Sequence, residues 1–386
     1  MVPPDSQMSL EASAMLTATG CGTLRQRLTT LLHTSRRDVL ALGTLWFLVL
    51  VYHARLFLPE PFRTYVVAGD FSKQFFPYRH FAASEWWQGR IPLWNPYVFA
   101  GHPFFADVQT AIFYPFTWPT VLLSRGNLRY VLLEAEMVLH YVLAATFVYL
   151  LGKTLFDRRF PALLLALTFT FSGFLTSYPA QQLATAIWLP LVVLCVERGA
   201  RSLCHSRVPP ATTVNGGMAA LAVGGRGLAW AALAGGALGI AFLAGHPQTV
   251  TFAGYTAGAF LLYRYAGGRG IIHAILGLIA FGLAAGGLAA VSLLPAAEFL
   301  GLSNRARMDY LTAGVGYEVT SLLGILFPLW RGEKALSIGI VPLLLAAVAV
   351  RWAFRGPVRF WTGVWLFGVV LSVGARTPLF WLLYHY

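Results

Sequence analysis

Residues 271–294 have the sequence IIHAILGLIAFGLAAGGLAAVSLL, and this stretch decides the fold. It contains no Asp, Glu, Lys or Arg. A transmembrane helix needs about 20 predominantly apolar residues, because the hydrocarbon core of a bilayer is about 30 Å thick. The whole chain has the same character, with 57% apolar residues, 11% charged residues and a mean hydropathy of +0.65. Soluble domains carry about 25% charged residues, so the sequence predicts a membrane protein.

Eight further apolar stretches of similar length lie on both sides of this segment. The predicted spans are 39–58, 130–151, 160–178, 183–197, 227–244, 249–265, 271–294, 336–352 and 358–374, of which the fourth is the shortest. We therefore expect an all-α polytopic membrane protein with about nine transmembrane helices. Residues 1–38 are predicted to be a disordered cytoplasmic tail, and residues 39–386 form the transmembrane domain.

The basic residues predict the orientation of the helices. Residues 1–38 carry Arg25, Arg27, Arg36 and Arg37, so the N-terminus is expected in the cytoplasm. The even-numbered connections then also lie inside, and each of them is basic: Lys153, Arg158 and Arg159; Arg198, Arg201, Arg207 and Arg226; Arg264 and Arg269; Arg351, Arg355 and Arg359. This pattern explains the net charge of +13, and no basic stripe with interleaved aromatic residues indicates a nucleic-acid partner.

The first extracytoplasmic connection, residues 59–129, is called the first loop below. Its segment 76–90, FPYRHFAASEWWQGR, predicts an amphipathic interfacial helix, with Phe81, Trp86 and Trp87 facing the membrane surface. The segment IPLWNPYVFAGHPFFADVQTAIFYP that follows predicts a folded cap on the bundle. The tripeptide Gly-His-Pro occurs at 101–103 and again at 245–247, in two outer connections.

Asp70 is the leading candidate for chemistry. It follows Gly69 in an apolar setting, where desolvation would raise the pKa of a carboxylate and suit it to act as a general base. The alternative is that Asp70 caps a helix that begins near Ser72. Asp107 is open to three interpretations: a second acid, a metal ligand, or an ordinary loop residue.

Other polar residues are expected near the same membrane face. Glu134, Glu136 and His140 lie in the second span, where ionisable groups are functional candidates, although a mutual hydrogen bond inside the bundle explains Glu136 and His140 equally well. The candidates for contact with substrate hydroxyls or phosphate are Lys73, Arg79, His102, Gln109, His246, Gln248, Glu298, Asn304 and Arg305. For an arginine such as Arg305 or Arg307, the alternative is that it only contacts lipid phosphate.

Several classes of function lack their signatures. The sequence contains no phosphate-binding loop of the GxxxxGK[ST] type, no HExxH and no GxSxG. The three cysteines, Cys21, Cys195 and Cys204, show no CxxC spacing, which argues against a disulfide framework or a cysteine zinc site.

A family resemblance rests on four blocks in order. These are AGDFSKQFFPYRHF with GRIPLWNPYVFAGHPFFADVQTAIFYP, then AGHPQTVTFAGY (244–255), LLPAAEFLGLSNRA (293–306) and SIGIVPLLLAAVAV (337–350). From about residue 65 onward the chain resembles the YfhO family of bacterial membrane proteins, which are similar to GT-C-type glycosyltransferases. The resemblance implies a GT-C-like fold in the bacterial inner membrane. Because that family is about twice as long, we expect the chain to be a fragment that lacks a C-terminal part.

The resemblance also implies an activity. A sugar would pass from a polyprenyl-phosphate-linked donor to a cell-envelope acceptor on the extracytoplasmic face, and Asp70 matches the position of the key acid in the first outer loop. A divalent metal, Mg²⁺ or Mn²⁺, would bind Asp70 or Asp107 if it takes part. Two other hypotheses remain open: a transporter or flippase of lipid-linked saccharides, and a non-catalytic assembly protein of the cell envelope.

Overall fold

The computed structural model describes residues 36–66, 69–178, 180–204, 214–327 and 334–385. Residues Leu45–Tyr386 form one compact unit, and the segment up to Thr44 forms another, of which the structure describes only the start of one helix. The predicted disordered tail, residues 1–38, lies almost entirely outside the described residues. The described part is helical, and its extended pairing is limited to one isolated bridge between Asn95 and His102.

Each predicted span coincides with helix. The long helices are α2 (Arg36–Tyr52), α5 (Tyr130–Phe156), α6 (Arg159–Thr170) with α7 (Gly173–Ser177), α8 (Gln181–Ala186) with α9 (Trp188–Cys204), α10 (Val214–Leu243), α11 (Pro247–Arg269), α12 (Ile271–Gly301), α14 (Ile340–Ala353) and α15 (Gly356–Ser372). Among the described residues, five stretches are long and apolar enough to cross a membrane: 130–156, 159–177, 181–203, 224–243 and 271–301. The polytopic helical fold is therefore confirmed, whereas the count of nine spans stays a prediction.

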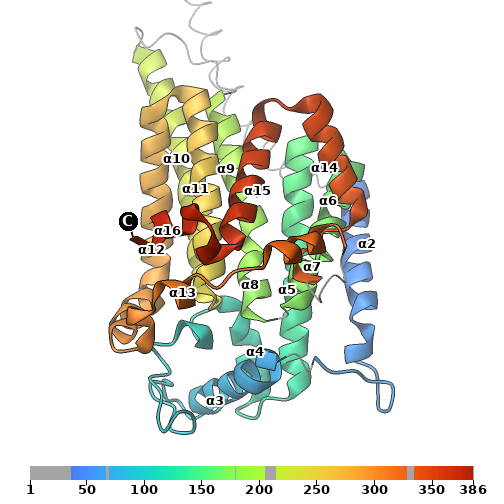
Figure 1. Cartoon of the computed structure of the whole chain (residues 1–386), viewed down its shortest axis with the longest axis vertical. Helices are drawn as coiled ribbons and strands as arrows, with labels where there is room; N and C mark the ends of the chain where they lie inside the picture. The colour runs from blue at the N-terminus through green and yellow to red at the C-terminus, as the bar shows by residue number, and fades with distance from the viewer. Residues whose placement is uncertain (1–35, 67–68, 179, 205–213, 328–333, 386) are drawn as a thin grey trace, which may run out of the picture. The chain divides into compact units, whose positions relative to one another are not determined.

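The helices α9, α10, α11 and α12 pack side by side, and α5 packs against α6 and α9 (Figure 1). Glycine permits the closest of these contacts. A Cβ atom at Gly235 in α10 would lie 2.0 Å from the carbonyl oxygen of Phe281 in α12, and one at Gly239 would lie 2.8 Å from Leu288 Cβ. Small residues at such positions let membrane helices approach each other and gain van der Waals contact.

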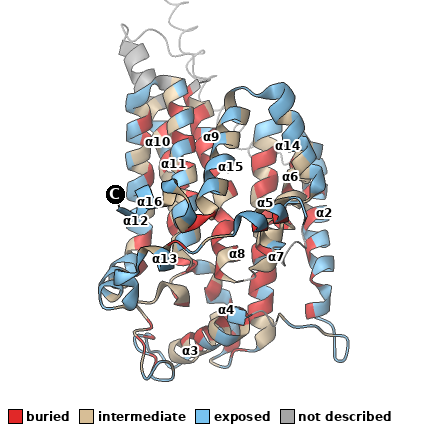
Figure 2. Ribbon diagram, in the orientation of Figure 1, coloured by how far each residue is buried: buried red, intermediate tan, exposed pale blue. Residues whose placement is uncertain are grey.

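The fourth predicted span is the best buried. Residues 181–203, expected to be short and insecure, form a stretch of α8 and α9 that is 78% buried in its most apolar window, whereas α12 is only 22% buried (Figure 2). The central position explains the short apolar run, because a helix surrounded by protein does not need lipid-facing residues on every side.

The first loop has a small hydrophobic core of its own. Its helices are α3 (Phe76–Trp87) and α4 (Trp118–Ser124), and its core contains Tyr78, Ala82, Phe104 and Ile112. Phe81 and Trp86, two of the residues predicted to face the membrane surface, are partly buried and pack within the first loop: the Phe81 ring lies 4.9 Å from the Phe104 ring, and the Trp86 ring lies 5.6 Å from the Trp118 ring. Of the three residues, only Trp87 is exposed.

A buried ion pair fixes the beginning of the first loop to α5. Glu134 has no solvent-exposed surface. Its carboxylate accepts hydrogen bonds from Arg63 Nη2 at 2.7 Å and from the backbone N–H of Val66 at 3.0 Å. A carboxylate buried so completely requires such partners, because an uncompensated charge there would cost several kcal/mol.

Candidate active site

Asp70 lies at the start of a helical turn that leads into α3. The turn η2 (Phe71–Phe75) is π-helical and continues directly into α3. Phe71 and Phe75 point into the core and are buried, which turns Asp70 to the exposed side of the same segment. The predicted desolvated setting of Asp70 was therefore wrong: its apolar sequence neighbours are buried, and the carboxylate itself is not.

Asp70 also does not act as a helix cap. Its backbone is helical, with φ −67° and ψ −25°, and its side chain accepts no capping hydrogen bond. Among the residues that the structure places, Asp70 has no hydrogen-bond or ion-pair partner. Lys73 follows three residues later and is also exposed, so both charged groups lie on the same side of the turn.

A row of side-chain amides begins one turn after Asp70. Gln74 Nε2 donates to Gln109 Oε1 at 3.0 Å, and Gln181 Nε2 donates to the Gln109 carbonyl at 2.9 Å. Gly245, in the second Gly-His-Pro tripeptide, packs here as well: a Cβ atom at that position would lie 2.8 Å from the Val108 carbonyl oxygen. The two connections that contain this tripeptide therefore meet at Gln109. Our interpretation of the sequence did not include Gln74 and Gln181 among the candidate residues. The sequence feature that could have identified them is a side-chain amide within a mostly apolar run, FSKQFF for Gln74 and PAQQLA for Gln181.

Asp107 and His102 form a pair beside this row. The distance from His102 Nε2 to Asp107 Oδ2 is 3.0 Å, and Asp107 Oδ1 accepts the backbone N–H of Gln109 at 2.9 Å. The Tyr78 ring stacks on His102. Burial, followed by the nearby Asp107 charge, raises the pKa of Tyr78 to about 12. These contacts favour the interpretation of Asp107 as a loop-organising acid.

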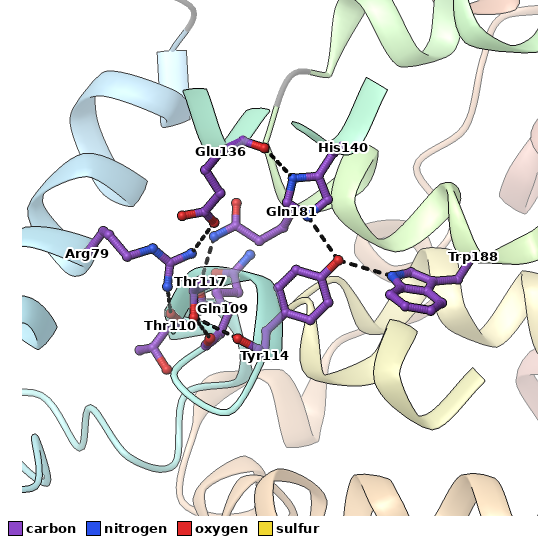
Figure 3. Close-up of polar contacts among 10 residues, drawn as sticks. Arg79, Gln109, Thr110, Tyr114, Thr117, Glu136, His140, Gln181 and Trp188 are labelled. Atoms are coloured by element: carbon purple, nitrogen blue, oxygen red, sulfur yellow. Dashed lines mark hydrogen bonds and ion pairs between the residues drawn. The ribbon is translucent and has the colours of Figure 1, made fainter. Parts of the chain in front are cut away.

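Arg79 is not available to an anionic substrate, contrary to the sequence-based expectation. It is buried, and its Nη2 atom lies 3.1 Å from Glu136 Oε1 (Figure 3). Its Nη1 atom also donates to the Thr110 carbonyl at 3.4 Å. The guanidinium therefore joins three elements of the structure: α3, the chain around Thr110, and α5.

The predicted contact between Glu136 and His140 exists, but it uses the backbone. His140 Nδ1 lies 2.6 Å from the carbonyl oxygen of Glu136, and the Tyr114 hydroxyl lies 2.9 Å from His140 Nε2 (Figure 3). The Trp188 Nε1–H group donates to the Tyr114 oxygen at 3.1 Å. One assignment of the protons satisfies Glu136, His140, Tyr114 and Trp188 together. His140 is neutral, donates from Nδ1 to the Glu136 carbonyl, and accepts the Tyr114 hydroxyl proton at Nε2. With both nitrogens occupied, His140 has a structural role.

A small cavity of about 30 Å³ lies next to this network. Arg79, Glu136 and Gln181 line it, and each contributes one buried atom without a protein partner: Arg79 Nε, Glu136 Oε2 and Gln181 Oε1. One donor and two acceptors match the bonding capacity of a water molecule, and buried polar groups require partners of this kind. A cavity of this size is too small for a sugar.

The second Gly-His-Pro tripeptide places His246 at the start of α11. His246 Nδ1 accepts the backbone N–H of Thr249 at 3.2 Å. Burial lowers the pKa of His246, which favours the neutral ring and leaves its proton on Nε2. His246 Nε2–H is thus a donor for a hydroxyl or phosphate oxygen, and Gln248 beside it is exposed.

The remaining candidates lie at the far end of α12 and just beyond it. Glu298, Asn304 and Arg305 are all exposed. The Phe299 ring lies 5.7 Å from the His102 ring, so this end of α12 contacts the first loop. The structure therefore brings His102, Asp107, Gln109 and the Gly245–His246 turn together with α12, whereas Arg79 is withdrawn into the interior.

A divalent metal finds little support in the donor set. Within the described part of the chain, no group of three or more His, Cys, Asp or Glu side chains is arranged to hold a metal ion. Asp107 already uses both oxygens within the loop.

Comparisons with known proteins give one structural likeness. No protein-family model matches the chain, and no curated protein matches it. The chain is similar to the archaeal oligosaccharyltransferase AglB from Archaeoglobus fulgidus, solved in complex with an inhibitory peptide and a dolichol-phosphate, with a TM-score of 0.38 and 14% sequence identity. The match covers 86% of this chain and 49% of that one, so the chain spans about half the length of that protein.

Proposed function

We propose that the protein is a membrane glycosyltransferase that uses a polyprenyl-phosphate-linked sugar at the first-loop side of the membrane. One observation carries the proposal. The first loop contains four acids, and three of them are bonded: Glu60 to the Tyr65 hydroxyl, Glu85 to Arg90, and Asp107 to His102. Asp70 is the fourth, and it has no partner among the residues placed in the structure.

A free carboxylate at this position suits base catalysis. An acid that holds a fold in place must keep its hydrogen bonds, whereas a general base needs unshared oxygens that a substrate proton can reach. Asp70 stands on a helical turn whose two phenylalanines are buried, so its backbone is held firmly although its side chain is exposed. The resemblance of this segment to the YfhO family supports the same residue independently.

The proposed reaction inverts the anomeric carbon. The acceptor hydroxyl attacks that carbon while Asp70 removes its proton, a new C–O bond forms, and the bond to the lipid phosphate breaks. The phosphate leaves with the bonding electron pair. Lys73 and Arg305 are the exposed cations proposed to stabilise the developing charge, and His246 Nε2–H and Gln248 would hold the phosphate or a sugar hydroxyl. Gln109, Glu298 and Asn304 are proposed to bind the saccharide.

The transport hypothesis receives less support from the same residues. A saccharide path through the bilayer would present unpaired polar groups along the helices. Glu134, Glu136 and Glu197, the acids of α5 and α9, each form an ion pair with arginine.

The test is glycosyl transfer by the Asp70→Asn variant. Purified protein in vesicles is supplied with a polyprenyl-phosphate sugar and a cell-envelope saccharide acceptor, and product is measured at equal amounts of folded protein. Loss of a general base should lower the rate by about 10²–10⁴-fold. The matched control is Glu85→Gln, which alters a paired acid of the same loop and should retain transfer.

Two results would overturn the proposal. Unchanged transfer by Asp70→Asn would remove Asp70 from the mechanism. Movement of the intact lipid-linked saccharide across the vesicle, without a glycosidic product, would favour the transporter.

A further inference from the structure

The segment Asn95–His102, called the aromatic loop below, is closed and rigid. Its ends are joined by two backbone hydrogen bonds, Asn95 N–H to His102 O at 2.8 Å and His102 N–H to Asn95 O at 2.9 Å. The Asn95 side chain accepts the backbone N–H of Tyr97 at 2.9 Å, and Gly101 N–H donates to the Val98 carbonyl at 2.8 Å. The conformation of the loop is therefore fixed from within.

This conformation is strained at its tip. Phe99 and Ala100 have φ angles of +52° and +56°, and Gly101 follows with +120°. In the left-handed region the Cβ atom of a non-glycine residue lies too close to the following carbonyl oxygen. Glycine is required at 101, because a Cβ atom there would lie 2.4 Å from the Trp94 ring. Strain of this kind persists where the surrounding structure imposes it, and often marks a functional segment.

The aromatic loop exposes two aromatic rings, although the Tyr97 ring touches Phe81 at a centroid distance of 6.2 Å. Tyr97 and Phe99 are each 84% exposed. Trp94, Leu93 and Ile91, immediately before them, are more than half exposed. A contiguous apolar surface of this kind requires an apolar partner.

The position of the aromatic loop, next to the end of α12, indicates that its apolar partner is lipid. The His102 ring contacts Phe299 near the end of α12, a membrane-spanning candidate with most of its surface exposed. Leu302, directly after α12, is 84% exposed. The lipid-facing surface of α12 therefore continues, by way of Phe299 and Leu302, onto the aromatic loop.

The charges beside the loop are complementary to lipid headgroups. Arg305 and Arg307 lie in η5 (Asn304–Arg307), which packs against the end of α12. Both arginines are exposed, and neither forms an ion pair with a described residue. Arginines next to apolar rings attract anionic headgroups while the rings enter the interface.

We propose that the aromatic loop is a membrane anchor: Tyr97 and Phe99 insert into the boundary between headgroups and acyl chains of the leaflet on the first-loop side. The anchor takes the place that the sequence assigned to Phe81 and Trp86 of α3, which pack inside the loop core instead. It holds the first loop, and with it Asp70, at a fixed depth. A saccharide platform is the competing use of exposed rings, but His102, the polar group nearest Phe99, is buried and bonded to Asp107.

The experiment measures depth by spin labelling. Tyr97→Cys and Phe99→Cys are prepared in a background with alanine at Cys21, Cys195 and Cys204, labelled with a nitroxide, and reconstituted in vesicles of zwitterionic phospholipid with and without anionic phosphatidylglycerol. The accessibility of each label to oxygen, which concentrates in the bilayer, is compared with that to a water-soluble nickel chelate. The matched control is Gln88→Cys, because Gln88 is an exposed polar residue of the first loop that lies outside the aromatic loop.

The anchor predicts that labels at 97 and 99 prefer oxygen several-fold more than the label at 88, and that anionic lipid increases the difference. Labels at 97 and 99 that are as accessible to the chelate as the label at 88 would overturn the proposal. Labels accessible to the chelate until a saccharide is added would also overturn it, in favour of sugar binding. Neither result depends on transfer activity, so the proposal stands or falls separately from Asp70.

Discussion

Two polar regions lie close together in the chain and differ in every physical respect. Around Arg79, Glu136, His140 and Tyr114 the groups are buried and joined by hydrogen bonds. Around Asp70 and Lys73 the groups are exposed and have no partner in the described structure. Asp70 and Arg79, one from each region, lie within ten residues of each other, at the start of η2 and in α3.

The difference indicates that the Arg79 region stabilises the fold, whereas the Asp70 region is available for the proposed chemistry. A buried charge keeps its partner because the desolvated charge alone is costly, so the Arg79 region holds the first loop onto α5. An exposed carboxylate is solvated by water and needs no such partner, so it can exchange a proton with a substrate. Substitutions in the Arg79 region should therefore lower the free energy of unfolding, whereas substitutions at Asp70 should lower the rate of glycosyl transfer.

The largest loss of stability is expected for Arg79→Leu. The change leaves Glu136 buried without its cation, which should lower the free energy of unfolding by about 3–5 kcal/mol. Denaturant unfolding in detergent micelles measures the effect. In the double variant Arg79→Leu with Glu136→Leu, part of the loss should be recovered, because no uncompensated charge remains. A double variant less stable than Arg79→Leu would contradict the assigned pairing.

A smaller loss is expected for Tyr114→Phe. Removing the hydroxyl leaves His140 Nε2 and Trp188 Nε1–H without their bond, at a cost of about 1–3 kcal/mol. The same unfolding measurement applies. The control is Tyr255→Phe, since Tyr255 is 69% exposed and should lose little stability. Equal effects of the two substitutions would show that the buried chain of hydrogen bonds does not stabilise the fold.

The smallest effect is a gain in stability, from Ala100→Gly. Glycine adopts a φ of +56° without the steric cost of a Cβ atom, so the free energy of unfolding should rise by about 1 kcal/mol. Ala106→Gly, at a position without positive φ, should lower it slightly. A loss of stability at position 100 would mean that the aromatic loop is not strained.

The sequence predicted the helices well because apolar length is a local property. Residues 271–294 and the other predicted spans all fall on helices. The physical requirement that a segment of about 20 apolar residues be helical in lipid does not depend on distant contacts.

The sequence did not predict which polar groups pair. Arg79 and Glu136 are 57 residues apart, and Arg63 and Glu134 are 71 apart. Nothing in the local pattern distinguishes a cation that will be buried from one that will stay exposed. The same reason applies to α3: amphipathicity reveals an apolar face, but it does not reveal that Phe81 packs against Phe104 and Trp86 against Trp118. The exposure of Asp70 was not foreseen, because Phe71 and Phe75 occupy the interior in its place.

The most direct test of the contrast measures transfer rate and unfolding free energy together for Asp70→Asn and Arg79→Leu. We expect Asp70→Asn to unfold like the unmodified protein while its transfer rate falls by about 10²–10⁴-fold. Arg79→Leu should lose stability and, per folded molecule, retain far more transfer than Asp70→Asn. If Asp70→Asn loses stability in proportion to its activity, or if it transfers sugar at the normal rate, Asp70 is not the catalytic base.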